Sequence, residues 1–128
     1  MEISIISHEK KDHLLIETVA TLDTKEKLLA QSQRLYEEIA KHGFKKIIID
    51  ERETTLPVDL VPYFDLVKNY INEFPPEIRE LKIATVVAEE YKEYAATWET
   101  LCMSRGLNFN GFTSYDKALQ WLLSENEE

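Results

Sequence analysis

The sequence predicts an α/β fold in which a five-stranded mixed sheet is covered by four helices. Three observations lead to this fold class. Two largely apolar runs, Ile47–Ile49 and Ala84–Val87, are typical of inner strands that are buried on both faces. Amphipathic segments separate the later strands, and strand–helix–strand repeats imply parallel pairing through right-handed crossovers. The first two strand-like segments are joined by a short polar turn, which predicts an opening hairpin and makes the sheet mixed.

The N-terminal third of the chain supplies the hairpin, one helix and the first buried strand. Strands are expected at residues 2–7 and 14–21, on either side of the polar turn 8–13. A helix is expected from about Thr24 to His42, with Asp23 as its N-cap and Gly43 as its stop. The strand at 45–51 follows, and residues 51–59 form a loop.

The second helix is predicted to begin at Asp59, which has the side chain of an N-cap. Its predicted core row consists of Leu60, Phe64, Val67 and Ile71. Tyr63, Tyr70 and Phe74 form an additional aromatic row about a third of a turn away. That second row needs a cover, which can be the neighbouring helix, a second copy of the chain or an apolar ligand; the neighbouring helix is favoured.

The last part of the chain alternates strand and helix once more. A strand at 82–88 precedes a helix from about Glu90 to Arg105, whose predicted core face includes Trp98 and Cys102. A strand at 107–114 leads to a last helix capped by Ser114, and the chain ends in an acidic tail at about 124–128.

Length and composition place limits on function. The 128 residues fit a single domain, 1–128, and no apolar run approaches the roughly 18–20 residues that cross a bilayer. The net charge of −9 disfavours nucleic acid as a partner, because affinity for polyanions depends on Lys and Arg. The single cysteine excludes an internal disulfide, and we expect a cytoplasmic protein.

Motifs for catalysis and cofactors are missing from the sequence. Its three glycines do not form a phosphate-binding loop, so no nucleotide cofactor is expected. Acidic side chains follow three strands, namely Asp23, Asp50, Glu51, Glu53, Glu89 and Glu90. They are suited to Mg²⁺ or to capping helices, and we favour capping. His8 and His13 flank the first turn, where exposure is favoured over a metal site.

Three segments carry a resemblance to a known family: KKIIIDERETTLPVDLVPYFDLV, KIATVVAEEYKEYAATWETLCMSRG and FTSYDKALQWLL. Over nearly its full length the chain resembles the STAS domain, specifically its SpoIIAA-like, STAS/SEC14-like branch. The resemblance implies the fold of anti-sigma-factor antagonists, in which an Asp-Ser pair follows the third strand and the serine is phosphorylated. Aligned on Asp50, Asp59 matches the Asp, but Leu60 stands in place of the serine. Thr54 and Thr55 lie upstream and match only in a shifted alignment.

These observations lead first to a non-enzymatic regulatory or binding module. Its expected binding region is the loop and helix after the third strand, represented by Asp50, Thr54, Thr55, Asp59, Tyr63, Tyr70 and Phe74. The expected partner is a protein or a second copy in a weak homodimer. The alternative is a carrier of a small apolar or lipid-like ligand, as the SEC14-like resemblance implies. A metal-dependent enzyme that uses the acidic residues ranks third.

Overall fold

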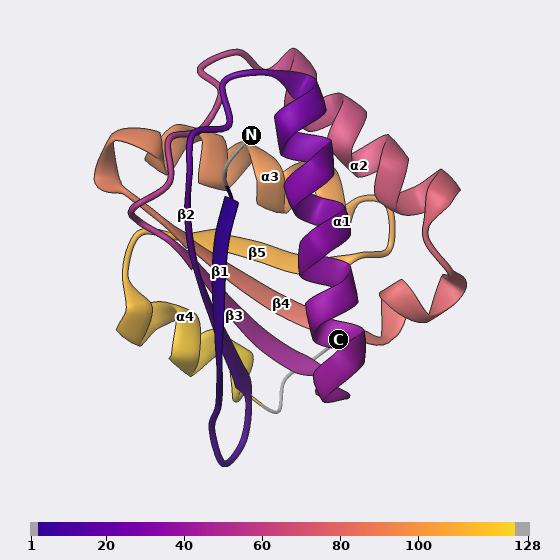
Figure 1. Ribbon diagram of the computed structural model, residues 1–128, viewed down its shortest axis with the longest axis vertical. Helices are drawn as coiled ribbons and strands as arrows, with labels where there is room; N and C mark the ends of the chain where they lie inside the picture. Colours follow the sequence, from indigo (N-terminus) through magenta and orange to yellow (C-terminus); the bar gives the residue numbers. More distant parts are fainter. Residues whose placement is uncertain (1–2, 125–128) are drawn as a thin grey trace.

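The sheet contains five strands whose order in space follows their order in the chain, β1-β2-β3-β4-β5. The computed structural model describes residues 3–124 (Figure 1). The strands are β1 (Ile3–Glu9), β2 (Leu14–Ala20), β3 (Lys46–Glu51), β4 (Lys82–Val87) and β5 (Asn108–Phe112). β1 and β2 are antiparallel, and every other neighbouring pair is parallel. The predicted mixed sheet with an opening hairpin is therefore confirmed.

Four α-helices cover the sheet, three on one face and one on the other (Figure 1). They are α1 (Lys25–His42), α2 (Val61–Glu73), α3 (Lys92–Met103) and α4 (Tyr115–Leu122). Two short 3-10 helices, η1 (Pro76–Glu80) and η2 (Glu89–Tyr91), precede β4 and α3. The buried apolar side chains form a larger cluster under α1, α2 and α3 and a smaller one under α4. The four predicted helices are present, and the structure shows which face each one covers.

Alternate residues of β3 point to opposite faces of the sheet, as the pleat of a strand requires. Ile47 and Ile49 belong to the larger cluster, whereas Ile48 belongs to the smaller cluster under α4. Because β3 lies between β2 and β4, this apolar run is buried on both faces, as predicted. The same alternation places Glu51 on the face of Ile47 and Ile49. The pleat therefore directs the carboxyl group of Glu51 toward α1, α2 and α3.

The ends of α1 follow the capping rules, with one correction. The N-cap is Thr24, whose hydroxyl accepts a 3.2 Å hydrogen bond from the Lys27 backbone N–H, and not Asp23 as predicted. Asp23 instead accepts a 2.9 Å hydrogen bond from the Lys27 ammonium group. Gly43 ends the helix as predicted, at a φ of 75°, a left-handed conformation that favours glycine.

The buried face of α2 differs from the predicted one. The helix buries Tyr63, Leu66, Val67 and Tyr70, while Phe74 at its end is half-buried. Of the predicted core row, Leu60 and Phe64 are 43% and 40% exposed, and only Val67 is fully buried. Tyr63 and Tyr70 of the aromatic row therefore pack inside the molecule, covered by the neighbouring helix α3 as favoured from the sequence, and Phe74 keeps part of its surface exposed. The physical reason is that the Tyr63 hydroxyl finds a backbone carbonyl to bind, so the ring can be buried without an unsatisfied polar atom.

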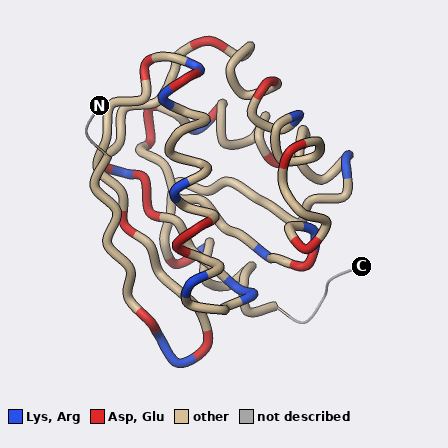
Figure 2. Tube along the Cα trace, turned by 45° about the vertical axis from the view of Figure 1, so that its right-hand side comes forward, with Lys and Arg blue, Asp and Glu red and all other residues tan. Residues whose placement is uncertain are grey.

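Charged side chains of both signs are interspersed over the chain (Figure 2). The basic pair Lys10–Lys11 occupies the tip of the β1–β2 hairpin and is flanked by Glu9 and Asp12. Within residues 3–124, no helix is both long and apolar enough to cross a membrane. The predicted acidic tail falls almost wholly on residues 125–128, which lie outside the described part of the chain.

Candidate functional site

A cavity of about 70 Å³ lies between the sheet and the three helices α1, α2 and α3. For comparison, one water molecule needs roughly 10–15 Å³ of such space, so the cavity has room for a small organic group. Its lining comes from α1 (Leu28, Gln31, Ser32, Leu35), the sheet (Ile49, Glu51, Thr85, Val87, Gly111), the β3–α2 loop (Leu56), α2 (Tyr63, Leu66, Tyr70) and α3 (Tyr94, Ala95, Trp98). Most of these side chains are apolar or aromatic, and a few polar groups lie among them.

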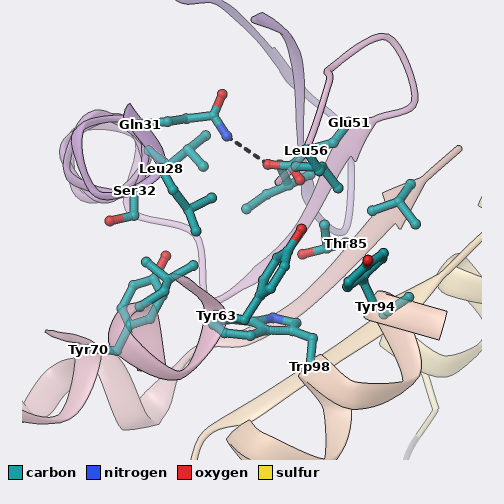
Figure 3. A pocket seen from close by; sticks show the side chains of 16 residues that line it. Leu28, Gln31, Ser32, Glu51, Leu56, Tyr63, Tyr70, Thr85, Tyr94 and Trp98 are labelled. Atoms are coloured by element: carbon teal, nitrogen blue, oxygen red, sulfur yellow. Dashed lines mark hydrogen bonds between the residues drawn. The ribbon is translucent and has the colours of Figure 1, made fainter. Parts of the chain in front are cut away.

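The most unusual of these polar groups is the carboxyl group of Glu51 at the end of β3. Glu51 is 8% exposed, and its Oε2 accepts a 2.8 Å hydrogen bond from Nε2 of Gln31 on α1 (Figure 3). Burial raises the pKa of Glu51 to about 7; the Gln31 hydrogen bond acts in the opposite direction, and the charge of Asp50 adds to the rise. The described residues that line the cavity include no Lys, Arg or His. The ionised form of Glu51 thus lacks a counter-charge in the cavity.

The other polar atom of the Gln31 side chain has no hydrogen-bond partner. Its side chain is 2% exposed, and Oε1 has no hydrogen-bond donor within the described structure. A buried amide oxygen without a donor costs free energy, on the order of 1–3 kcal/mol, and such groups need an explanation. A bound molecule or a water in the cavity is the simplest source of the missing donor.

Four aromatic side chains line the cavity opposite α1, two from α2 and two from α3 (Figure 3). Tyr63 and Tyr94 are stacked, with ring centroids 5.5 Å apart and an interplanar angle of 27°. Tyr70 lies 6.1 Å from Trp98, centroid to centroid. Trp98 is half-buried and packs against the larger cluster, in agreement with the predicted core face, and it also lines the cavity. Its neighbour on the same helix, Cys102, is fully buried, as predicted.

The two stacked tyrosines also hold the loop between β3 and α2. The Tyr63 hydroxyl donates a 2.7 Å hydrogen bond to the carbonyl oxygen of Pro57, and the Tyr94 hydroxyl donates one to the carbonyl oxygen of Val58. The same rings thus touch the cavity with their carbon atoms and the loop with their oxygen atoms.

At the β5 side of the cavity, the sheet and α3 are in very close contact. A Cβ atom added to Gly111 would lie 2.7 Å from the carbonyl oxygen of Ala95 and 2.8 Å from its Cβ. Only glycine permits this separation, because any side chain would push α3 away from β5. Gly111 therefore sets the depth of the cavity between the sheet and α3.

The predicted binding residues after β3 do not form one site. Asp50 is half-buried and forms a bidentate pair with Arg52, at 2.9 Å to Nε and 2.8 Å to a terminal guanidinium nitrogen. Burial acts to raise the pKa of Asp50, but hydrogen bonds from Arg52 outweigh it and hold that pKa below its usual value. Thr54 is buried, with its hydroxyl oxygen 2.7 Å from that of Thr18. Thr55 is exposed and bridges to Thr21.

Asp59 is exposed and makes no capping hydrogen bond, contrary to prediction. The N-cap of α2 is Leu60, and Pro62 in the first turn reduces the number of N–H groups that need a cap. Leu60 and its neighbours Val58, Val61 and Phe64 are all exposed, which defines an apolar patch at the start of α2. Of the predicted residues, the cavity contains Tyr63 and Tyr70, whereas Phe74 packs at its far side against Tyr36 and Tyr70.

The residues at the first turn also differ from expectation. His13 was expected to be exposed but is 5% exposed; its Nδ1 lies 2.7 Å from Asp12 Oδ1 and its Nε2 lies 3.4 Å from the Tyr115 hydroxyl. It is buried because Tyr115 of α4 covers the start of β2. Across residues 3–124, no group of three or more His, Cys, Asp or Glu side chains is arranged to hold a metal ion.

From the sequence, Glu51 was considered for a metal site or a helix cap but not as the polar end of a cavity, and Gln31, Tyr94 and Trp98 were not selected as site residues. The signal for Glu51 was present, because the period of two along β3 places it on the same face as Ile47 and Ile49. No comparable signal exists for Gln31, which looks like any polar residue of an amphipathic helix until its partner is known.

Comparisons with known proteins agree with this architecture. No family model and no curated protein matches the chain. Among solved structures, it is similar to an uncharacterised DUF3478-family protein with a SpoIIAA-like fold from Shewanella loihica PV-4. The identity is 24%, the TM-score is 0.55, and the match covers 94% of this chain and 93% of that one. An anti-sigma factor antagonist from Mycobacterium paratuberculosis matches with a TM-score of 0.63 and 9% identity over 96% of each chain. The fold is therefore SpoIIAA-like, of the STAS type, which confirms the predicted resemblance.

Proposed function

We propose that this chain with a SpoIIAA-like fold is a non-enzymatic binding module that holds a small molecule in the cavity between the sheet and α1, α2 and α3. The observation that carries the proposal is the composition of that cavity. Ligand sites in proteins are typically concave and mostly apolar, with a few polar groups that orient the ligand. This cavity has such a lining, with the buried pair of Gln31 and Glu51 as its polar end.

The proposal corresponds to the carrier function that was the alternative to a regulatory module in the interpretation of the sequence. A cytoplasmic location and the absence of catalysis belong to the same proposal. A carrier or sensor needs to hold its ligand without reacting with it, and a concave, largely apolar space is suited to that task.

The test is native mass spectrometry of the purified chain, combined with ligand-observed NMR of a small fragment set containing neutral, cationic and anionic members. We expect a retained mass or fragment binding that is lost in Ser32→Leu, which enlarges a buried side chain of the cavity wall. Circular dichroism verifies that the variant is folded. The proposal is contradicted if no retained mass and no bound fragment of any class is detected. Equal binding by the folded Ser32→Leu variant and by wild type would also contradict it.

The second candidate is a regulatory module that binds a protein partner, and the apolar patch of Val58, Leu60, Val61 and Phe64 favours it. The solved structure of an anti-sigma factor antagonist has the same fold, and its name describes action on another protein. In sequence, Asp59 lies within the patch and Asp65 follows it directly, and the whole chain carries a charge of −9. The partner we propose therefore presents an apolar face with a basic rim, since a second acidic copy is repelled.

A photo-crosslinking residue at Val61 tests this second candidate in cells of the source organism. We expect a discrete cross-linked product that disappears in the background of Leu60→Ser and Phe64→Ser. Ile6 is the matched control position, because it is a similarly exposed apolar residue, 54% against 64%, in the middle of the edge strand β1. A cross-linked product that contains two copies of the chain would indicate self-association instead. The same cross-linked products from Val61 and from the control position would contradict a specific binding site.

A further inference from the structure

We infer that the cavity selects a small organic cation, such as an alkylammonium or quaternary ammonium group, with Glu51 as its counter-ion and aromatic rings around it. This inference rests on the proposed small-molecule function and names the class of the ligand. Its basis is the juxtaposition of one buried carboxyl group with four aromatic side chains.

The first step concerns the charge that the cavity lacks. Buried carboxylates in proteins are normally paired with a cation, because an unpaired charge in a medium of low dielectric is costly. Glu51 has an amide as its hydrogen-bond partner, and the charged neighbour that acts on it is Asp50, which has the same sign. A cationic ligand supplies the missing opposite charge, whereas an anionic ligand would meet a buried carboxyl group of its own sign.

The second step concerns the aromatic wall. Cations bind favourably over the faces of Trp and Tyr rings, and ammonium ligands are often held in cages of such rings. The cavity presents Tyr63, Tyr70, Tyr94 and Trp98 (Figure 3). The hydroxyls of Tyr63 and Tyr94 are engaged by loop carbonyls, so these two residues offer their rings to the cavity.

The third step concerns Gln31. Its Nε2 holds Glu51 in place from α1, and its Oε1 is a buried acceptor without a protein donor. When Glu51 is ionised, the two polar atoms of Gln31 and Glu51 that are not used in this hydrogen bond, Gln31 Oε1 and Glu51 Oε1, are therefore both acceptors. This polarity matches a ligand that carries positive charge or N–H donors, and it disfavours a ligand that has only acceptors.

The competing class is a neutral, hydrogen-bonding molecule that binds to protonated Glu51. The two classes differ in how affinity depends on pH. A permanent cation binds to the carboxylate form, so its affinity rises with pH and levels off above about pH 8, because burial raises the pKa of Glu51 to about 7. Gln31, Tyr63 and Tyr70 face Glu51, Asp50 acts on it from the opposite face of β3, and none of these groups is basic.

The experiment compares three probes of similar size: tetramethylammonium, tert-butanol and trimethylacetate. Binding is followed by the fluorescence of Trp98 in a Trp121→Phe background, since Trp121 packs against Phe112 on the α4 face. We expect tetramethylammonium to bind at least about tenfold more tightly than tert-butanol at pH 8, with no detectable binding of trimethylacetate. Its affinity should fall about tenfold between pH 8 and pH 6.

The control variant is Glu51→Gln, which keeps the size and hydrogen-bonding capacity of the side chain but removes its charge. We expect this variant to lose tetramethylammonium affinity by about tenfold or more and to lose the pH dependence, while its circular dichroism spectrum is unchanged. Preference for tert-butanol or trimethylacetate, or retained cation binding in Glu51→Gln, overturns the cation inference and leaves the binding module standing. Failure of all three probes overturns the cation inference, and the fragment set described above then decides separately whether the module binds any small molecule.

Discussion

Gln31 and Glu51 lie 20 residues apart in the chain and are joined by a 2.8 Å hydrogen bond from Nε2 to Oε2. The bond connects α1 to the carboxyl end of β3 within the larger of the two buried clusters. An amide donor satisfies one carboxyl oxygen but does not neutralise the charge. The stability of the fold is therefore expected to depend on the protonation of this one side chain.

The first prediction concerns the free energy of unfolding of wild type relative to Glu51→Gln. The pKa of Glu51 is raised from 4.5 to about 7 in the folded protein. Because the folded value is the higher one, the stabilising contribution is fully present below pH 4.5 and is lost as the pH rises through 7. We expect the stability of wild type relative to the variant to fall by about 3 kcal/mol over this window.

Urea denaturation of both proteins at a series of pH values measures this difference. Subtracting the two curves removes the contribution of all groups that titrate in the same way in both proteins. A difference that does not change with pH would show that Glu51 is not buried in the way described.

The second prediction concerns the contact between Gly111 and Ala95. Gly111→Ala should destabilise the protein by about 1–3 kcal/mol, because the added Cβ would lie 2.7 Å from a backbone oxygen of α3. Ala95→Gly in the same chain should restore part of the loss, since it removes one of the two close atoms. Thermal or urea unfolding measures both changes, and an unchanged midpoint for Gly111→Ala would contradict the close packing.

The third prediction concerns His42, whose ring lies between Glu9 and Glu38 at 2.6 and 3.1 Å. The ring nitrogens of His42 donate hydrogen bonds to these carboxylates, and these bonds, the one to Glu9 first, raise the pKa of His42 above its ordinary value of 6.5 despite some desolvation. The corresponding stabilisation is present below pH 6.5 and is lost as the pH rises through the folded value. NMR titration of the ring should give a midpoint above 6.5, and Glu9→Gln should lower it; an unchanged midpoint would exclude the ion pair in solution.

The fourth prediction concerns phosphorylation. Leu60 has no hydroxyl, and the Thr54 hydroxyl is buried against Thr18 at 2.7 Å. A serine–threonine kinase of the anti-sigma type should therefore transfer no phosphate to residue 60 and very little to Thr54 or Thr55. Intact-mass measurement after incubation with the kinase checks this expectation. A stoichiometric phosphate that disappears in Thr55→Ala would restore a phosphorylation switch at the exposed threonine.

The strands were the most predictable part of the fold, because the pattern of β3 and β4 depends only on local apolarity. The buried face of α2 was predicted wrongly for a physical reason. Both rows of that helix are apolar, so hydrophobicity alone does not decide between them. The choice was made by the hydroxyl of Tyr63 and the carbonyl of Pro57, which meet only when the loop has folded.

The candidate site was less predictable than the fold, since its parts come from distant positions of the chain. Tyr63 and Tyr70 were selected from the sequence as part of an aromatic row that needs a cover, with the neighbouring helix favoured, and Tyr94 and Trp98 of α3 provide that cover. Glu51 was interpreted as a possible metal ligand or cap, although its place in the alternation of β3 indicated burial. Its partner Gln31 was not identifiable, because a hydrogen bond between a helix and a strand has no sequence signature.

The sequential strand order has a consequence for synthesis on the ribosome. Because each strand pairs with the one made before it, the sheet can grow at a single edge as the chain emerges, and no later strand has to be inserted between earlier ones. The second layer forms only when α4, which follows all five strands in the sequence, covers Leu15, Ile48, Ala84 and Val86. A nascent chain from which α4 has not yet emerged therefore exposes an apolar sheet face to the solvent.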